Sequence, residues 1–401
     1  QGDLAFSYDT TKFIPLDQQK VCYLIHTTLE TKKIILEHLK DSAMYGGMVE
    51  GIGPRYCPSI EDKIVKFADK DRHQLFIEPE SVHLDTIYVQ GFSTSMPEVV
   101  QEQMIRTLPG FKNCVVKKYA YAIEYDAIDP LQLKPSLETM PVENLFCAGQ
   151  INGTSGYEEA AGQGLIAGIN AVLKLTGKKP LILRRDEAYI GVMIDDLVTK
   201  GTKEPYRMLT SRAEYRLLLR HDNADLRLRE YGYRVGLVND TQYQAFLTKK
   251  AEIEELEELL KETKFKVDSP LSALLVTKGD SPLETTTSGY NLLKRPSLSI
   301  ADLTQYLTKK YSAAVLEEVE INIKYEGYIK KQQKTAETQK KLEEQLIPND
   351  IDYNKIENIA LEARQKLSKI RPISIGQASR ISGVNPSDIG ILLLHIKAKE
   401  R

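Results

Sequence analysis

The pattern of apolar and polar positions changes its character along the chain. Up to about residue 180, short apolar runs alternate with amphipathic stretches, and the later part follows a helical period with many charged positions. Short apolar runs predict strands, and apolar residues three and four apart predict helices. This order predicts an α/β region followed by an all-α region. In the first part we expect a helix at residues 30–39 and strands at residues 21–25, 74–77, 86–89, 115–125 and 145–148.

The second part predicts long helices at residues 241–263 and 312–346, the latter broken only at Gly327, with a loop region at about 268–298 between them. A last helical unit follows, in which a turn at residues 372–380 enters a short helix. Asn385 then suits the N-cap of the next helix and Pro386 its first turn. Two short helices joined in this way can hold nucleic acid or a partner helix, or can form an ordinary bundle corner.

A glycine-rich stretch follows the expected strand at 145–148. Gly149, Gly153 and Gly156 lie in a loop, and a helix with many small residues begins near Glu158. Three glycines within this helix, Gly162, Gly164 and Gly168, predict a close approach of its backbone to another body. A strand, a glycine loop and a helix N-terminus together favour an anionic ligand, for which a dinucleotide is the natural candidate. The alternative is tight packing of the helix on a sheet without a ligand.

The second cluster of interest is centred on Cys57. Pro58 suits the first position of a helix, and Glu61 and Asp62 suit its first turn, which places the thiol at a helix N-terminus two residues after Arg55. Both surroundings lower the pKa of a thiol and favour a nucleophilic or redox role. The alternative is a small buried hydrophobic residue.

The third cluster is rich in arginine. If the chain is helical from about Ser211, Arg212, Arg216 and Arg220 share one face. Arginine forks suit phosphates, and neighbouring tyrosines suit unstacked bases. The alternative is an ion-paired face, with carboxylates available from Glu214, Asp222 and Asp225.

Composition limits these hypotheses only in part. The 54 Lys and Arg residues are balanced by 56 Asp and Glu residues, so any polyanion partner must be bound by a local patch. Four cysteines without a C-x-x-C pair, and no apolar run long enough for a membrane span, lead us to expect a cytoplasmic protein. The six histidines show no ligand spacing and Asp195–Asp196 has no His or Cys beside it, so we expect no metal site.

The three clusters, at residues 53–63, 148–161 and 201–216, together closely resemble the flavoprotein subunit of the tRNA uridine 5-carboxymethylaminomethyl modification enzyme, the glucose-inhibited division protein A family. The resemblance implies the C-terminal part of a Rossmann-like FAD-binding domain with an NAD-binding insertion, then a helical C-terminal domain. The domains it implies are the remainder of the insertion (1–75), the FAD-binding part (76–180), a domain of long helices (181–347) and a subdomain that docks tRNA and a GTPase (348–401).

The resemblance also implies an activity. Members of the family act with a partner GTPase on the wobble uridine of tRNA, and they install an aminomethyl or carboxymethylaminomethyl group at its C5 atom. FAD is the cofactor, NADH reduces it, and methylenetetrahydrofolate is the one-carbon source. A homodimer is expected.

Site residues follow from the same resemblance. Cys57 matches a cysteine needed for activity, either for nucleophilic addition to the uracil ring or for proton handling there. Flavin contacts are expected at Gln150 and around it, at Gly149, Asn152, Gly153, Tyr157 and Glu158. NAD contacts are expected within residues 53–67, at Gly53, Pro54, Arg55, Tyr56, Cys57, Pro58, Ser59, Ile60, Glu61, Asp62, Lys63 and Phe67. Charge alone suggests tRNA contacts at Lys203, Arg207, Arg212, Arg216 and Arg220.

One departure from the family pattern matters. The chain begins at Gln1 and holds no glycine-rich dinucleotide fingerprint, so we expect a C-terminal piece that alone binds FAD weakly or not at all and is inactive. Two alternatives remain: a folate- and FAD-dependent tRNA (uracil-5) methyltransferase, and a non-catalytic helical module that binds tRNA or the GTPase. A flavin-dependent disulfide reductase is disfavoured because the chain has no cysteine pair.

Overall fold

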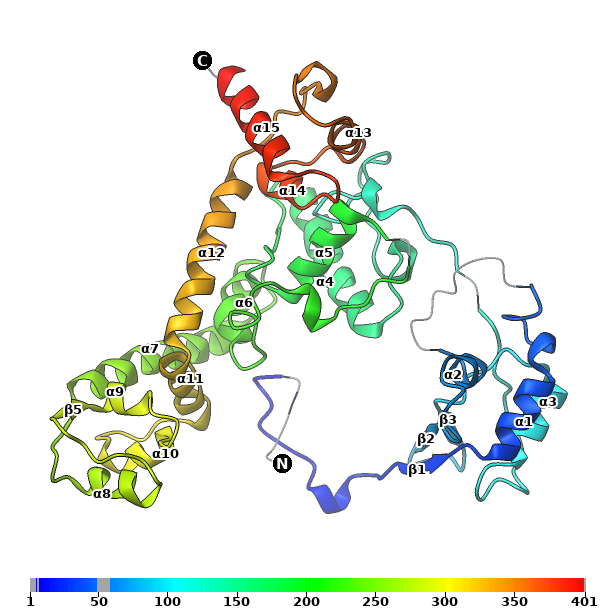
Figure 1. Cartoon of the computed structure of the whole chain (residues 1–401), viewed down its shortest axis with the longest axis horizontal. Coiled ribbons are helices and arrows are strands. Elements are labelled where there is room, and N and C mark those ends of the chain that lie inside the picture. The colour runs from blue at the N-terminus through cyan, green and yellow to red at the C-terminus, as the bar shows by residue number, and fades with distance from the viewer. Residues whose placement is uncertain (1–4, 6, 49–57, 124, 203, 400–401) are drawn as a thin grey trace. The chain divides into compact units, whose positions relative to one another are not determined.

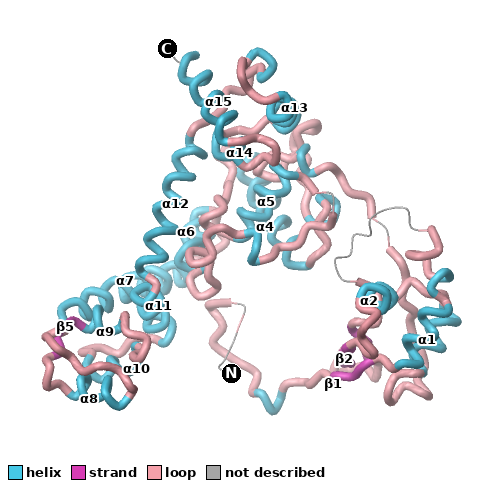
Figure 2. Tube along the Cα trace, viewed as in Figure 1, coloured by secondary structure: helices cyan, strands magenta, loops and turns pink. Residues whose placement is uncertain are grey.

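The computed structural model of the chain (Figure 1) describes residues 5, 7–48, 58–123, 125–202 and 204–399. The chain divides into two compact units. Unit 1 comprises Gln1–Pro130, Cys147–Gly164 and Thr202–Arg207, and unit 2 comprises Leu131–Phe146, Leu165–Gly201 and Met208–Arg401. Figure 2 shows strands in the first unit and mainly helices and loops in the second. The predicted order of an α/β region and a helical region is therefore confirmed.

Unit 1 contains a three-stranded antiparallel sheet in the order β1-β2-β3. Leu24 pairs with Phe76, and Ile77 pairs with Val89. Along β2, Leu75 and Ile77 are buried while Phe76 is exposed, so one face of the sheet lies on the helices. The elements are β1 (Tyr23–His26), α1 (Leu29–Glu37), α2 (Ile60–Lys66), β2 (Gln74–Pro79), β3 (Ile87–Gln90) and α3 (Glu98–Arg106).

Three of the predicted strands and the first helix are confirmed, but two strands are wrong. Residues 115–125 form no strand within their described part, and Val115 and Tyr121 are exposed. In the run 145–148 only Phe146 pairs, through one isolated bridge to Glu138. An apolar run becomes a strand only where a neighbouring strand pairs with it over several residues. In the described chain the first run has no such partner and the second has only this one bridge.

Helix α4 (Tyr157–Leu175) begins in unit 1 and ends in unit 2. Unit 2 has two larger apolar cores, one formed around residues 253–323 and one around residues 347–396. Its further helices are α5 (Tyr189–Lys200), α6 (Ala224–Arg234), α7 (Asp240–Glu262), α8 (Pro270–Thr277), α9 (Gly289–Leu293), α10 (Ile300–Leu303), α11 (Ala313–Lys324), α12 (Glu326–Glu344), α13 (Leu361–Ile370), α14 (Ile375–Ser379) and α15 (Pro386–Lys399), with a short strand pair β4 (Lys264–Phe265) and β5 (Thr287–Ser288).

The helices predicted at residues 241–263 and after Asn385 are confirmed, and the Asn385 side chain accepts a hydrogen bond from the Asp388 amide at 3.0 Å. The predicted loop at 268–298 is wrong in part, because α8 and α9 lie within it and bury four leucines. The break in the long helical pattern falls at Tyr325, and Gly327 lies inside α12.

The helix expected from Ser211 is also wrong. Only the 3-10 turn Thr210–Arg212 forms, and the following residues are turns. Ala213 and Tyr215 are both buried, a spacing of two that a helix does not give. Arg212, Arg216 and Arg220 therefore do not share a helical face.

No helix in the described part of the chain combines the length and the apolarity needed to cross a membrane. The domain boundaries proposed from the resemblance remain predictions.

Candidate functional site

The glycine-rich stretch of unit 1 forms a turn held by buried side-chain amides. The Gln163 side chain, fully buried on α4, accepts hydrogen bonds from the Gly149 amide at 3.1 Å and from Asn152 Nδ2 at 2.8 Å. Its Nε2 atom donates to Thr154 Oγ1 at 2.9 Å. Asn152 Nδ2 also donates to the Cys147 carbonyl oxygen at 2.9 Å. One glutamine thus joins both ends of the turn to the helix.

Two glycines of this turn cannot be exchanged without strain. Gly149 and Gly153 have φ values of +84° and +78°, where side chains other than glycine are disfavoured. A Cβ atom on Gly153 would lie 2.7 Å from Thr202 Oγ1. The sequence predicts a close approach to another body at the glycines of α4, but Gly164 and Gly168 have no described atom within 4 Å of a Cβ position. The close approach occurs at the turn instead, against the segment Thr202–Arg207 of the same unit.

Through this segment, the first residues of the arginine-rich cluster contact the turn. The Tyr206 amide donates to the Gly153 carbonyl oxygen at 2.8 Å, and the Tyr206 side chain is only 4% exposed. Arg207 Nε donates to Glu159 Oε1 at 3.1 Å. The buried Glu159 carboxylate lies against Gly156, where a Cβ atom would stand 1.6 Å from it. A negative charge of the protein itself therefore already faces the N-terminal turn of α4.

The residues predicted to contact flavin differ in exposure. Gly149 and Asn152 are buried, Gln150 and Gly153 are half-buried, and Tyr157 and Glu158 are exposed, Tyr157 to 93%. Asn152 therefore supports the turn from inside. Its Oδ1 atom and the hydroxyl of Ser155 are buried and have no hydrogen-bond partner among the described residues. Such atoms call for a donor that the described chain does not supply.

The predicted NAD stretch is described only from residue 58 onward. Gly53, Pro54, Arg55, Tyr56 and Cys57 lie outside the described residues, so the structure gives no position for the proposed catalytic thiol.

The prediction that Pro58 occupies the first helical position is wrong, because α2 begins at Ile60 and Ser59 is its N-cap. The Ser59 hydroxyl accepts from the Asp62 amide at 3.2 Å. The predicted first-turn positions of Glu61 and Asp62 are confirmed. Ile60 and Glu61 are fully buried, and Glu61 accepts two hydrogen bonds from Ser95 at 2.8 Å. These two side chains hold the helix in place.

The other residues of the stretch are accessible to different degrees. Pro58, Ser59, Asp62 and Lys63 are half-buried, and Phe67 is 50% exposed. An NAD contact at these side chains remains a prediction.

The arginines proposed as tRNA contacts also separate by environment. In unit 2, Arg212 and Arg216 are exposed, whereas Arg220 is held by Asp222 at 2.9 Å and by Glu318 at 2.7 Å. Asp222 thus neutralises Arg220, as the ion-paired alternative supposes. Lys203 lies outside the described residues.

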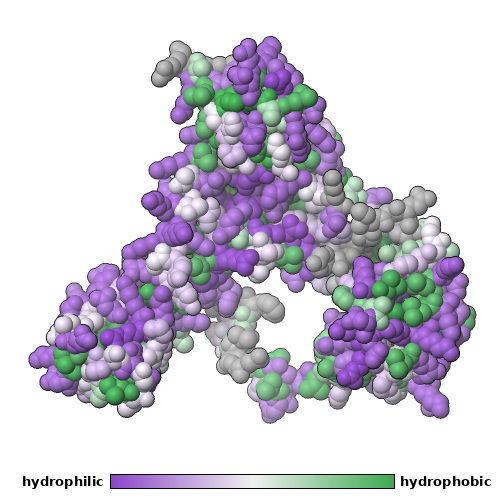
Figure 3. All heavy atoms as spheres, viewed as in Figure 1, coloured by the Kyte–Doolittle hydropathy of each residue, from purple (hydrophilic) through white to green (hydrophobic). Residues whose placement is uncertain are grey.

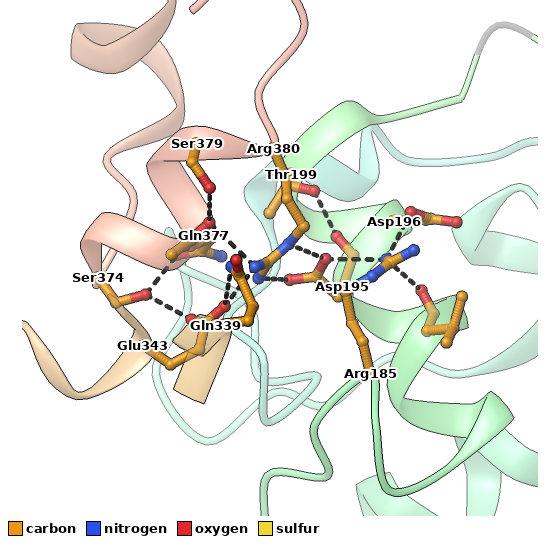
Figure 4. Close-up of polar contacts among 12 residues, drawn as sticks. Arg185, Asp195, Asp196, Thr199, Gln339, Glu343, Ser374, Gln377, Ser379 and Arg380 are labelled. Atoms are coloured by element: carbon orange, nitrogen blue, oxygen red, sulfur yellow. Dashed lines mark hydrogen bonds and ion pairs between the residues drawn. The ribbon is translucent and has the colours of Figure 1, made fainter. Parts of the chain in front are cut away.

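Pattern reasoning did not identify the strongest charged cluster of unit 2, which Figure 4 shows. Arg185 on the approach to α5 donates to Asp195 at 3.0 Å and to Asp196 at 2.8 Å, and also reaches Glu214 at 2.8 Å. Arg380, directly after α14, holds Asp195 through two hydrogen bonds of 2.5 and 2.6 Å. The acidic pair considered as a metal site thus binds two arginines.

The cluster joins three helices of unit 2. Glu343 on α12 accepts from Arg380 Nη1 and from Ser374 Oγ, the N-cap of α14. Burial alone would raise the pKa of Asp196, but the charge of Arg185 and the hydrogen bond from Lys200 outweigh it and hold that pKa below its usual value. Asp196 is therefore charged at neutral pH, and the hydrogen bonds of the cluster connect α14 to α5 and α12.

A second buried group behaves differently. Burial, together with a hydrogen bond to Asp222, raises the pKa of Glu318 to about 7, and the nearby Arg220 opposes this shift only in part. The pKa of Asp222 is lowered, because hydrogen bonds with Glu318 and Arg220 outweigh its own burial. Glu318 is thus the carboxyl group of this pair that takes up the proton.

Comparison with known proteins decides the family. Residues 1–179 match the family model of glucose inhibited division protein A. Residues 240–333 and 335–401 match the C-terminal helical domain and the C-terminal helical bundle of the tRNA modifying enzyme MnmG/GidA. The chain belongs to the MnmG/GidA family. The resemblance inferred from the sequence is confirmed.

Relatives in this family are close. The chain is 58% identical over 394 residues to the tRNA uridine 5-carboxymethylaminomethyl modification enzyme MnmG of Acholeplasma laidlawii, a match that covers 98% of this chain and 64% of that protein. For MnmG of Bacillus cereus the identity is 56%, with 98% and 62% covered. The chain therefore spans somewhat less than two thirds of the length of these MnmG relatives.

Solved structures agree with the sequence comparison. Aquifex aeolicus GidA in its form II crystal superposes with a TM-score of 0.81 at 47% identity, covering 96% of this chain and 60% of that one. The form I crystal gives a TM-score of 0.80 at 49% identity, with 94% and 60% covered. The described chain thus has the fold of the corresponding part of GidA.

Proposed function

We propose that the chain is part of an enzyme that modifies the wobble uridine of tRNA at C5, with FAD as cofactor and a partner GTPase. The observation that carries the proposal is the family membership along the chain, from the α/β part to the C-terminal helical bundle. The relatives are named as tRNA uridine 5-carboxymethylaminomethyl modification enzymes. NADH as reductant, methylenetetrahydrofolate as one-carbon source, homodimerisation and a cytoplasmic location belong to the same proposal.

The residues of the turn fit a flavin. Asn152 Oδ1 and Ser155 Oγ are buried acceptors without a partner among the described residues, and a flavin carries N–H and hydroxyl donors. Gly149 and Gly153 adopt positive φ values that fix the course of the turn around these two side chains. The Glu159 carboxylate at the start of α4 disfavours a phosphate at that helix end. We therefore assign the turn, from Gly149 to Glu158, to the uncharged part of the cofactor.

Bound FAD would supply the redox chemistry of the reaction. The chain's own contribution is to hold and orient the cofactor, and Gln163 fixes the turn that would do so. The proposed flavin contacts are Gly149, Gln150, Asn152, Gly153, Tyr157 and Glu158. A preorganised backbone of this kind places a bound ring without reorganisation when the reaction occurs.

The stretch from Gly53 to Phe67 is the proposed NAD site, and its Cys57 is the proposed catalytic thiol. That thiol would either add to the uracil ring or handle a proton there. The proposed tRNA contacts are Lys203, Arg207, Arg212, Arg216 and Arg220. Among them, the exposed Arg212 and Arg216 have the accessibility that a phosphate contact needs.

The proposal is tested with a version that spans the full length of the relatives, here termed the full-length enzyme. This enzyme is incubated with the GTPase, FAD, NADH, methylenetetrahydrofolate and an unmodified tRNA, and the nucleosides are analysed by mass spectrometry. We expect an aminomethyl-type group on the wobble uridine. A methyl group on a uridine elsewhere would support the tRNA (uracil-5) methyltransferase instead, and no modification would refute both.

The methyltransferase alternative is not favoured, because the family models of the MnmG/GidA C-terminal helices match this chain to its last residue. For the chain by itself, a non-catalytic module that binds tRNA or the GTPase remains a proposal.

The proposed role of the thiol has its own test. In the full-length enzyme, Cys57→Ser should abolish modification while the flavin spectrum stays unchanged, because a hydroxyl is a far weaker nucleophile at neutral pH. Cys22→Ser is the matched control, since Cys22 is exposed and has no proposed role. Turnover of Cys57→Ser at the wild-type rate would exclude a reactive thiol.

A further inference from the structure

The outward face of α12 carries a row of three exposed lysines. Lys331, Lys334 and Lys341 are all exposed, and their spacing of three and seven residues places them on one side of the helix. Neighbouring charges of α12 are engaged: Lys330 pairs with Glu326, and Glu343 with Arg380. None of the three pairs with a carboxylate in the described part of the chain. We call these three residues the lysine row.

The middle of this face is open, and Glu337, three residues after Lys334 and four before Lys341, borders it without an ion pair to either lysine in the described part of the chain. Thr335 and Thr338 lie between the lysines, and their hydroxyls donate to backbone carbonyl oxygens within α12 at 3.1 and 3.0 Å. A Cβ atom on Gly327, at the start of the same face, would meet no described atom within 4 Å. The buried Ala336 lies on the opposite side of the helix, which contacts α14. The exposed Glu337 and Glu344 flank the row at one side.

The chemistry of the row favours a polyphosphate chain over a protein partner. The centre of a protein–protein interface is depleted in lysine, whereas this face presents three exposed lysines. Ammonium groups on flexible stems bind phosphates as point charges without a fixed geometry. The row extends over about 15 Å of the helix axis, long enough for several phosphates of one strand. Figure 3 shows a mainly hydrophilic surface along α12.

We propose that the lysine row of α12 binds the phosphate backbone of an RNA. The exposed Tyr328, beside the row and 68% accessible, offers a ring on which an unpaired base could stack. Because the chain as a whole carries a net charge of −2, this binding depends on the local row and not on overall charge. That the RNA is a tRNA rests on the proposed function.

The test uses the full 401-residue chain and a fluorescently labelled unmodified tRNA transcript, titrated at several salt concentrations. The variant K331E/K334E/K341E is compared with K250E/K266E/K310E, which changes the net charge equally at three exposed lysines that form no row. At moderate salt we expect the row variant to bind tRNA at least about tenfold more weakly. The slope of log affinity against log salt concentration should decrease by the amount that corresponds to about two to three phosphate contacts. The control should stay within about twofold of wild type.

Several outcomes overturn the inference. Unchanged affinity of the row variant, or an equal loss in the control, would mean that the row contributes no specific contact. In that case wild-type tRNA binding would still stand, and with it the proposed function. A wild-type chain that binds no RNA would refute both this inference and the proposed RNA contacts of the chain. A row variant that keeps tRNA but no longer binds the GTPase would assign the face to a protein.

A measurement on the wild type alone tests the inference without the risk that a variant misfolds. Lysine acetylation followed by mass spectrometry should show Lys331, Lys334 and Lys341 protected at least several-fold by bound tRNA, with Lys250 unprotected. Equal acetylation rates with and without bound tRNA would contradict the inference without any substitution.

Discussion

Two groups of positive charge in unit 2 differ in what surrounds them. Arg185, Arg220 and Arg380 have side chains only 6%, 12% and 15% exposed, and each is held by at least two carboxylates. The lysine row of α12 is exposed and pairs with no carboxylate among the residues that the structure describes. A buried charge must be paired, so the arginines belong to the fold, whereas the lysines remain available to a partner. Positive charge by itself therefore does not identify an RNA contact.

The largest loss of stability is expected when a buried arginine is removed. Arg380→Met leaves Glu343 without its guanidinium and Asp195 with Arg185 alone, and should cost about 3 kcal/mol or more. Amide hydrogen exchange in α14 and α15 measures the loss locally.

Arg380→Lys keeps the charge but loses the two-pronged contact to Asp195. It should therefore fall between Arg380→Met and wild type. The exposed Arg216→Met is the matched control and should change stability by less than about 0.5 kcal/mol. Wild-type exchange in Arg380→Met would show that the cluster does not fasten α14.

The second largest effect concerns pH. The folded pKa of Glu318, about 7, lies above its ordinary value of 4.5, so the folded state binds more protons between these values. The free energy of unfolding should therefore fall as pH rises from about 4.5 to about 7, by about 3 kcal/mol at most from this group. Asp222, whose pKa is lowered, loses its stabilising contribution only on the acid side of its ordinary 3.8, outside this window.

Glu318→Gln should remove this part of the pH dependence. Denaturant unfolding at several pH values between 5 and 8 measures it, and Glu317→Gln, at an exposed neighbour, is the control. If the free energy of unfolding of Glu318→Gln depends on pH as in the wild type, Glu318 of the wild type is charged throughout this range.

A smaller effect separates two kinds of glycine. Gly153→Ala should destabilise the turn by about 1–3 kcal/mol, because of its φ of +78° and the approach to Thr202. Gly164→Ala, in α4 with no described atom near its Cβ position, should be neutral or stabilising by up to about 1 kcal/mol. Thermal unfolding of both variants measures this difference in stability. Equal destabilisation would refute the role assigned to the turn.

The smallest effect on stability is expected from the lysine row. Changing Lys331, Lys334 and Lys341 together to Gln should alter the free energy of unfolding by less than about 0.5 kcal/mol, since all three are exposed and unpaired in the described chain. The contrast with Arg380→Met, measured under the same conditions, sharpens the distinction between charges that fold the chain and charges that bind. A large loss would place the lysines among the structural charges.

Local signals predicted much of this fold. The periodicity of α7 and the capping residues of α15 were sufficient, because a helix satisfies its own backbone. The runs at 115–125 and 145–148 were wrongly predicted as strands, because a strand depends on pairing partners that a local pattern does not show. The glycines of the turn were recognised by type, but the contact of Gly153 with Thr202 joins residues far apart in the chain.

The charged clusters show the same limit more strongly. Arg380 and Asp195 are 185 positions apart, and no spacing rule connects them. The sequence therefore assigned no partner to the Asp195–Asp196 pair, and only the fold shows that Arg185 and Arg380 bind it. Arg220 was placed among the RNA contacts by its spacing from Arg216, and the turn structure after residue 212 removes that argument.

The turn from Gly149 to Glu158 is proposed to contact the flavin of a tRNA-modifying enzyme, and a crystal structure of the full-length enzyme with FAD would test this contact. We expect backbone or side-chain atoms of the turn within hydrogen-bond distance of the flavin, about 3 Å, and Cys57 Sγ facing the same cavity. A flavin bound elsewhere, with the turn and Cys57 on opposite sides of the molecule, would contradict it.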